Sequence, residues 1–282
     1  MSHEGGYTPF EADITDHVTP GEGVRITALI NNTLHWQSIP PGVIEDTPAG
    51  KRQRYWHDFF NYYAGIHRTV WLYATDPAHI SDVMITTDLD GDTGVINYTA
   101  DAEAADDLET KVILRDAEGT EVATDTGPSG TLHVPNVHKW APGDGYLYDL
   151  EISLVRGDTV VDSYHQSVGV RTVQVDGIRF LINREPFYFT GFGKHEDLPV
   201  IGKGHSDAYL VHDFGLLKWI GANSFRTSHY PYSEVVLDYA DQQGIVIIDE
   251  TAAVGLNMGL GGGIFGSQGY QTFSPDTAND AT

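Results

Sequence analysis

The spacing of apolar positions changes along the chain and predicts an all-β part followed by a part in which strands and helices alternate. Near the N-terminus, apolar and polar residues alternate over residues 24–30, which predicts a half-buried strand. Residues 69–75 predict a second strand. Two or three strands do not form an independently stable sheet, so residues 1–75 are expected to be one piece of a larger domain.

Residues 76–172 show the pattern of an all-β sandwich. Short strand-like runs are separated by turn residues, for example Asp90-Gly91-Asp92. About seven short strands at this spacing are typical of an immunoglobulin-like sandwich. The expected strands are residues 82–87, 94–100, 111–116, 121–124, 131–134, 147–155 and 159–169.

From residue 173 onward the pattern becomes that of an α/β domain. Residues 173–182 predict a hairpin, and residues 187–191 predict a strand. Residues 206–220 predict a helix, because apolar residues recur on one face at helical spacing. That face consists of Leu210, Phe214 and Leu217.

The following stretch predicts a strand at residues 224–227, a helix from Ser233 to Gln243, and a last strand at residues 245–248. Ser233 is a favourable N-cap, and Gly244 suits the left-handed position after a helix. The wholly apolar run 245–248 is expected to be buried on both faces. A complete βα-barrel needs about 250 residues, and 110 remain from residue 173 to 282. We therefore expect the first three strands of a barrel, in a chain that starts inside one domain and stops inside another.

Polar side chains stand at the C-terminal end of each expected barrel strand. His195 follows the first strand, Arg226 and His229 end the second, and Asp249 and Glu250 end the third. In a βα-barrel these ends meet at one rim and form the active site. Carboxylates and imidazoles in this arrangement suit binding of sugar hydroxyls or acid and base chemistry.

Less specific interpretations of the same residues remain open. Arg226 is as well explained as an ion-pair partner of a strand-end carboxylate, and Asp249 and Glu250 could simply cap or pair. His195, His229 and Asp249 could in principle hold a metal, but no metal-ligand spacing supports such a site. We therefore expect no metal at these residues.

The charge balance excludes several classes of partner. Forty acidic residues against 16 basic ones give a net charge of −24, which would repel nucleic acid and anionic membranes. The excess of carboxylates favours a surface adapted to high salt. With no cysteine, disulfides and thiolate catalysis are excluded. No segment has the pattern of a signal peptide or a membrane span, so we expect a cytoplasmic protein without a membrane partner.

A resemblance to a known family narrows these expectations. Asn223-Ser-Phe-Arg-Thr-Ser-His-Tyr-Pro231 is similar to the signature of glycoside hydrolase family 2. Three further segments agree with its sugar-binding jelly roll, central sandwich and first barrel strand, namely residues 5–13, 138–148 and 191–197. The family implies the C-terminal part of a jelly roll in residues 1–75, an immunoglobulin-like β-sandwich in 76–172, and the N-terminal part of a TIM barrel in 173–282. The expected fold class is thus multidomain β plus α/β.

The family also implies a retaining glycosidase that uses two glutamates. Residues 57–61 with 64–68 resemble the β-glucuronidase branch rather than the β-galactosidase branch, which implies hydrolysis of terminal β-D-glucuronides. Carried over by resemblance, Asp58 and His229 contact the sugar hydroxyls and His195 is a further contact. One departure affects Asp58, since Asn61-Tyr-Tyr-Ala64 carries one more tyrosine than is usual in the family.

The catalytic glutamates of the family follow the fourth and seventh barrel strands, so both are expected downstream of Thr282. The 282 residues contain no Asn-Glu pair, and we expect them to be inactive by themselves. Two alternatives remain: a β-galactosidase-like glycosidase of the same family, and a non-catalytic carbohydrate-binding fragment. The complete protein could also form a homo-oligomer.

Overall fold

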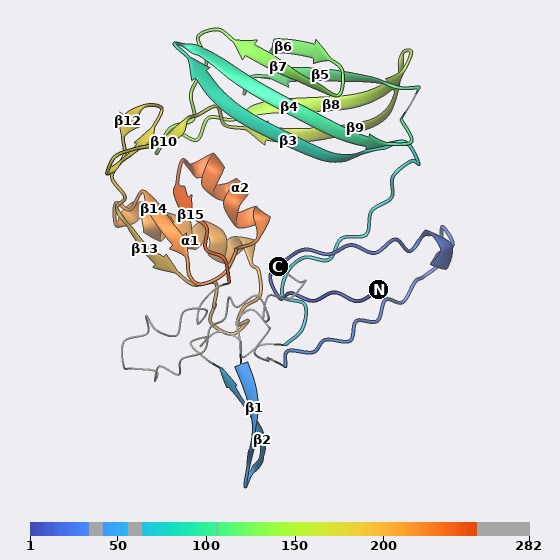
Figure 1. The fold of residues 1–282 in the computed structure, drawn as a ribbon, viewed down its shortest axis with the longest axis vertical. Helices are drawn as coiled ribbons and strands as arrows, with labels where there is room; N and C mark the ends of the chain where they lie inside the picture. The colour runs from blue at the N-terminus through green and yellow to red at the C-terminus, as the bar shows by residue number, and fades with distance from the viewer. Residues whose placement is uncertain (34–41, 56–63, 106, 253–282) are drawn as a thin grey trace.

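The computed structural model describes residues 1–33, 42–55, 64–105 and 107–252. Figure 1 shows a β-sandwich, an α/β unit beside it, and an extended N-terminal segment that carries a projecting hairpin. Among the described residues, no helix has the length and apolar character needed to cross a bilayer.

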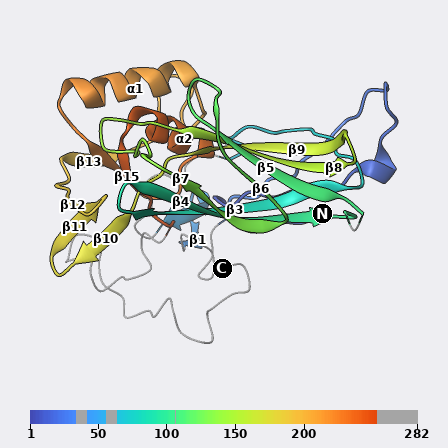
Figure 2. The same ribbon diagram turned by 90° about the horizontal axis from the view of Figure 1, so that it is seen from above.

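Seven strands of the described chain form two antiparallel sheets. In one, β3 (His79–Asp90), β4 (Thr93–Glu103) and β7 (Ser129–Val134) pair in the order β3-β4-β7. The other pairs β6 (Glu121–Thr126), β5 (Glu109–Arg115), β8 (Tyr148–Arg156) and β9 (Thr159–Val168) in the order β6-β5-β8-β9. Figures 1 and 2 show the strands of both sheets running along one long direction.

Alternation along these strands builds the sandwich core. Buried Ile96 and Tyr98 of β4 share one hydrophobic cluster with Val112 of β5 and with Leu150 and Ile152 of β8. The residues between them are more exposed, as expected for strands with one face on the core. Each of the seven predicted strands overlaps an observed one, and the sandwich prediction is confirmed.

The α/β unit follows the order that the apolar spacing predicts. A small antiparallel sheet of β10 (Val173–Asp176), β11 (Arg179–Ile182) and β12 (Glu185–Pro186) comes first. It is followed by β13 (Gly191–Lys194), α1 (Asp207–Trp219), β14 (Ser224–Thr227), α2 (Glu234–Gln243) and β15 (Val246–Ile248). Strands β13, β14 and β15 form a parallel sheet in that order.

Both helix predictions are confirmed in their bounds, but the predicted capping by Ser233 is wrong, because its side chain makes no capping hydrogen bond to α2. Helix α1 begins after Ser206 and buries Leu210, Phe214 and Leu217. Helix α2 ends at Gly244, which has the left-handed φ of 64° that a side chain would disfavour.

Two strand predictions in this unit are wrong in detail. The strand expected at residues 187–191 begins only at Gly191. Before that point the Asn223 side chain replaces a neighbouring strand, because it donates to the Tyr188 carbonyl and accepts from the Thr190 amide. The last strand is not buried on both faces: Ile248 is 48% exposed, since β15 lies at an edge of the described sheet.

The strands expected at residues 24–30 and 69–75 are absent from the described chain, and that prediction is wrong. Neither segment pairs with another strand there, and Leu29 and Trp71 are largely exposed. Alternation supplies only the side-chain face of a strand, whereas a sheet also needs backbone partners. The strands found in this part are instead a hairpin of β1 (Gly42–Thr47) and β2 (Gly50–Tyr55), preceded by a 3-10 turn, Thr15–His17.

Direct contacts join the sandwich to the C-terminal end of α2. The Trp140 indole donates to the Asp241 carbonyl at 2.7 Å, and the Gly143 amide donates to the Gly244 carbonyl at 2.8 Å. Arg171 stacks over the Trp140 ring at 4.7 Å and lies 3.6 Å from the Asp241 carboxylate. The sandwich therefore holds the α/β unit by a helix end.

Candidate functional site

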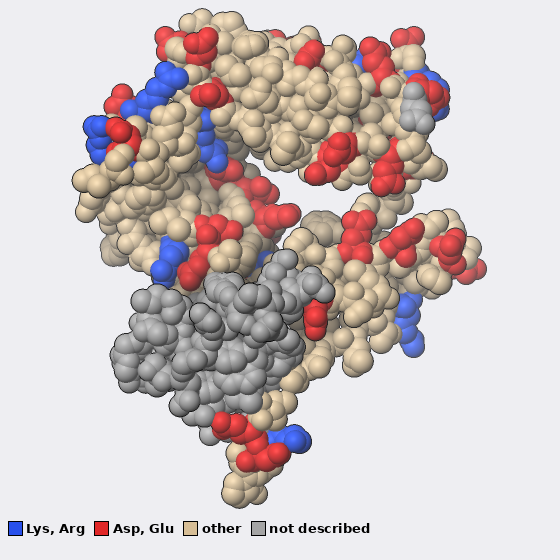
Figure 3. All heavy atoms as spheres, in the orientation of Figure 1, with Lys and Arg blue, Asp and Glu red and all other residues tan. Residues whose placement is uncertain are grey.

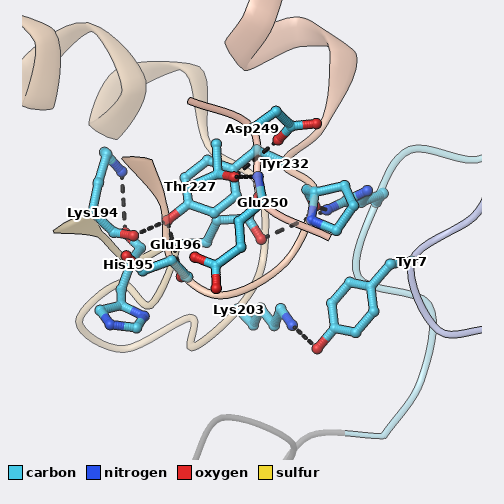
Figure 4. A network of polar contacts seen from close by, with 12 residues as sticks. Tyr7, Lys194, His195, Glu196, Lys203, Thr227, Tyr232, Asp249 and Glu250 are labelled. Atoms are coloured by element: carbon cyan, nitrogen blue, oxygen red, sulfur yellow. Dashed lines mark hydrogen bonds and ion pairs between the residues drawn. The ribbon is translucent and has the colours of Figure 1, made fainter. Parts of the chain in front are cut away.

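The register of the parallel sheet brings the residues after its strands to one edge. Lys194 is opposite Thr227, and Arg226 is opposite Ile248. Because all three strands point the same way, the residues that follow them share the C-terminal edge of the sheet. Figure 4 shows His195, Glu196, Asp249 and Glu250 gathered there.

His229 stands between side chains from the two neighbouring strand ends. Its ring lies 5.4 Å from the ring of His195, edge to face, and its Nδ1 lies 3.3 Å from Glu250 Oε1. We call His195, His229, Arg226 and Glu250 the strand-end cluster. The predicted convergence of the three strand ends is therefore present in the structure.

Glu250 connects His229 to Arg226. Its second carboxylate oxygen lies 3.2 Å from Arg226 Nε, an ion pair whose angles are not those of a hydrogen bond. The Glu250 side chain is three-quarters buried, while Arg226 is about half exposed. Of the two interpretations of Arg226, the structure supports the ion pair with a strand-end carboxylate, and this pair orients Glu250 toward His229.

Thr227 separates the roles of the two consecutive acids. Its buried hydroxyl donates to Asp249 Oδ1 at 2.9 Å and accepts the Glu250 amide at 2.8 Å. Asp249 is thus held by the neighbouring strand, as in the pairing interpretation, while the Glu250 side chain reaches His229. Thr227 fixes the end of β15 relative to β14.

The electrostatic surroundings favour a neutral His195. Burial, and next the positive charge of His229, lower the pKa of His195 below its ordinary value, with Asp197 opposing. An imidazole ordinarily titrates near pH 6.5, so His195 is neutral at pH 7. A neutral ring offers one donor and one acceptor, which matches sugar hydroxyls that both donate and accept.

A second group of buried polar residues includes Glu196, the residue after His195, and sequence reasoning missed it. Lys203 is 7% exposed and donates to the Tyr7 hydroxyl at 3.0 Å. Glu196 lies 3.8 Å from Arg68, and burial raises the pKa of Glu196 while Arg68, Lys203 and Lys194 oppose that shift. The sequence feature that could have pointed to this cluster is the scarcity of lysine, because two of only six lysines, Lys194 and Lys203, lie in it.

A cavity of about 40 Å³ lies at this cluster, lined among others by Arg68, Glu196 and Lys203. A water needs about 10–15 Å³ of such space. The cavity therefore has room for a few waters and is too small for a sugar ring.

Two further predicted features are placed as follows. Asp58 lies outside the residues that the structure describes. Within the described part of the chain, no group of three His, Cys, Asp or Glu side chains could hold a metal. Of the three ligands considered for a metal, Asp249 accepts from Thr227 instead.

Comparison with known proteins places these features in a family. The family model described as glycosyl hydrolases family 2, sugar binding domain, matches residues 1–76; glycosyl hydrolases family 2 matches 78–171; and the TIM barrel domain of that family matches 173–279. The chain belongs to glycosyl hydrolase family 2. It combines sugar-binding, immunoglobulin-like and partial TIM-barrel domains of that family.

Relatives in family 2 match nearly all of this chain and less than half of their own length. The β-glucuronidase of Paenibacillus borealis is 49% identical over 288 residues, covering 100% of this chain and 47% of that protein. Human β-glucuronidase is 46% identical over 274 residues, covering 91% and 42% respectively.

Solved structures of the family are similar in fold. The β-D-glucuronidase of Dictyoglomus thermophilum has a TM-score of 0.81 at 46% identity, over 90% of this chain and 44% of that one. The β-glucuronidase of Ruminococcus gnavus in complex with D-glucuronic acid has a TM-score of 0.83 at 38% identity, over 90% and 44%.

Proposed function

We propose that the protein containing these residues hydrolyses terminal β-D-glucuronides with retention of configuration. The observation that carries this proposal is the identity of 46–49% to proteins named β-glucuronidase, over 90% or more of this chain. A D-glucuronic acid complex of a relative with a TM-score of 0.83 supports the same substrate class.

In this proposal the described residues form one side of the sugar site. His229 binds a hydroxyl of the glucuronate ring, with Glu250 holding its Nδ1 at 3.3 Å. That contact directs Nε2 away from Glu250 and toward the sugar. His195, which is neutral, supplies a further contact to the sugar. Arg226 and Asp249 support these contacts. Asp58, which is not among the described residues, also binds the sugar ring.

In this proposal the chemical steps belong to two glutamates of the complete protein, which we expect outside these 282 residues. One attacks the anomeric carbon to form a glycosyl-enzyme ester while the other protonates the departing oxygen. The second residue then deprotonates the water that hydrolyses the ester. The residues of this chain bind and orient the sugar, and no metal or organic cofactor takes part.

Turnover by the complete protein tests this function. It should release product from an aryl β-glucuronide faster than from an aryl β-galactoside. His229→Gln should lower kcat/KM about tenfold or more, the loss expected for one sugar hydrogen bond. The matched control is His165→Gln, because His165 also pairs with a carboxylate, Asp149 at 3.1 Å, but lies in the sandwich.

Three results would contradict the proposal. Preference for the galactoside would favour the β-galactosidase alternative. Glucuronate binding without turnover by the complete protein would favour a carbohydrate-binding protein. Turnover by residues 1–282 alone, abolished by Glu250→Gln, would show that the catalytic carboxylates are not downstream.

The acidic surface supports a further proposal, that the complete protein works at high salt. Figure 3 shows Asp and Glu spread over one face with few Lys and Arg between them, in keeping with the net charge of −24.

We also propose a cytoplasmic homo-oligomer. Light scattering of the purified complete protein and fractionation of the source cells would test these two points.

A further inference from the structure

Lys203 lies beside a pair of stacked tyrosine rings that come from distant parts of the chain. The rings of Tyr7 and Tyr230 are 4.9 Å apart and nearly parallel, at 11°. Lys203 Nζ lies 3.6 Å from the centroid of Tyr230 and 4.4 Å from that of Tyr7, and it donates to the Tyr7 hydroxyl. Figure 4 shows the lysine directed at that hydroxyl.

This arrangement explains how the charge of a buried lysine is compensated. A buried ammonium needs compensation for the water that it loses. Aromatic faces carry negative potential and attract cations within about 6 Å, most strongly where water is excluded. With Lys203 at 7% exposure and Tyr230 at 2%, both conditions for a strong contact are met.

Tyr230 connects the Lys203 contact to the strand-end cluster, because it directly follows His229. Its amide donates to the Thr227 carbonyl at 3.2 Å, so the backbone on either side of His229 is held close to the end of β14. The Tyr230 ring is fixed by Lys203 on the side of the N-terminal segment. Because Tyr230 directly follows His229, a shift of its ring that displaces the Tyr230 backbone also displaces the backbone of His229.

We propose that Lys203 is a positioning residue, which clamps Tyr230 beneath Tyr7 and thereby sets both the His229 ring and the docking of the N-terminal segment on the barrel. The 196 residues between Lys203 and Tyr7 make this a link between the sugar-binding domain and the barrel. The functional consequence rests on the proposed glucuronide site. The effect on the position of the His229 ring does not depend on that site.

Variants of the complete protein that contains these residues test the clamp. Lys203→Met keeps the aliphatic length and removes the charge, while Lys203→Arg restores a cation that can stack on the rings. Lys51→Met is the matched control, since Lys51 is an exposed lysine paired with Asp46 on the hairpin. Two readouts are needed: the NMR ring-proton signals of His229 without ligand, and the affinity for D-glucuronic acid by calorimetry.

The clamp predicts that Lys203→Met shifts the His229 signals and weakens D-glucuronic acid binding about tenfold. Lys203→Arg should recover most of both effects, and Lys51→Met should change neither. If Lys203→Met does not fold, Tyr7→Leu removes the outer ring with the lysine intact and should still shift the His229 signals.

Unchanged His229 signals in folded Lys203→Met, or in Tyr7→Leu where Lys203→Met does not fold, would overturn the proposal. A shift that Lys203→Arg fails to reverse would assign Lys203 to packing alone and also overturn it. Absence of D-glucuronic acid binding by the unmodified complete protein would count against the proposed sugar site. The His229 signals would still decide whether Lys203 acts as a clamp.

Discussion

Gly191→Ala is the substitution that most directly tests how the strand-end cluster is assembled. Gly191 lies opposite Ser224 in the β13–β14 pair. A Cβ at Gly191 would lie 2.1 Å from the Ser224 carbonyl oxygen, whereas ordinary contact begins at 3.4 Å. The strands would have to separate by about 1.3 Å, the difference between these two distances. Because Ser224 is only 2% exposed, its strand has little room to move away.

The cost follows from the contacts that such a movement breaks. The Asn223 amide donates to the Thr190 carbonyl at 2.9 Å, and the Ser228 amide donates to the Lys194 carbonyl at 3.0 Å. Two such bonds and overpacking together cost about 2–4 kcal/mol. Replacing glycine restricts the unfolded chain and returns about 0.4–1 kcal/mol. The expected net loss is about 1–3.6 kcal/mol.

Hydrogen exchange at the two amides measures this loss locally. At about 1.4 kcal/mol per tenfold, exchange at Asn223 and Ser228 should accelerate about 5- to 400-fold in Gly191→Ala. Gly215→Ala is the control, because a Cβ at Gly215 in α1 meets no atom within 4 Å and alanine favours the helix. Gly193→Ala should have a smaller effect, since its nearest contact at 2.4 Å is the Ser228 hydroxyl rather than backbone. Wild-type exchange rates at both amides in Gly191→Ala would refute the reasoning.

Two further predictions concern solution conditions. Burial, followed by the charges of Lys203 and Arg68, lowers the pKa of His67 from 6.5 to about 4. Because the folded state favours the neutral ring, this contribution to the unfolding free energy is fully present above pH 6.5. It is lost as the pH drops toward 4. After allowance for the partial exposure of His67, about 1–2 kcal/mol of unfolding free energy should be lost across that range. In urea unfolding, the unfolding free energy of His67→Gln should depend less on pH, whereas that of the exposed control His133→Gln should depend on pH as in the wild type. Equal pH dependence in all three proteins would contradict the assignment. Raising KCl shortens the Debye length from about 10 Å at 0.1 M to about 3 Å at 1 M, so the unfolding temperature of a chain with net charge −24 should rise. A falling or constant unfolding temperature would argue against the high-salt surface.

Local patterns determined much of this protein. Helix α1 follows from apolar residues at helical spacing, and α2 ends at Gly244 because glycine adopts the left-handed conformation without strain. The seven sandwich strands follow from alternation between turns. These features depend on residues within one element, so they can be predicted without knowing its neighbours.

The candidate site was predicted in part for the same reason. His195, His229 and Glu250 could be assigned to one edge because parallel strands with helices between them bring their C-terminal ends together. Which acid turns toward His229 could not be predicted. Thr227, on the neighbouring strand, holds Asp249 and leaves Glu250 to bridge His229 and Arg226.

Contacts between distant segments were decided only by the tertiary structure. Alternation at residues 24–30 predicts a strand, yet a strand forms only where another backbone supplies its hydrogen-bond partners, and none of the described residues does so. Lys203 carries no periodic signal, because its position is set by tyrosine rings from two other parts of the chain. Sequence alone thus determined the sandwich strands, the two helices and the edge where polar groups gather, while tertiary packing decided which of those groups meet.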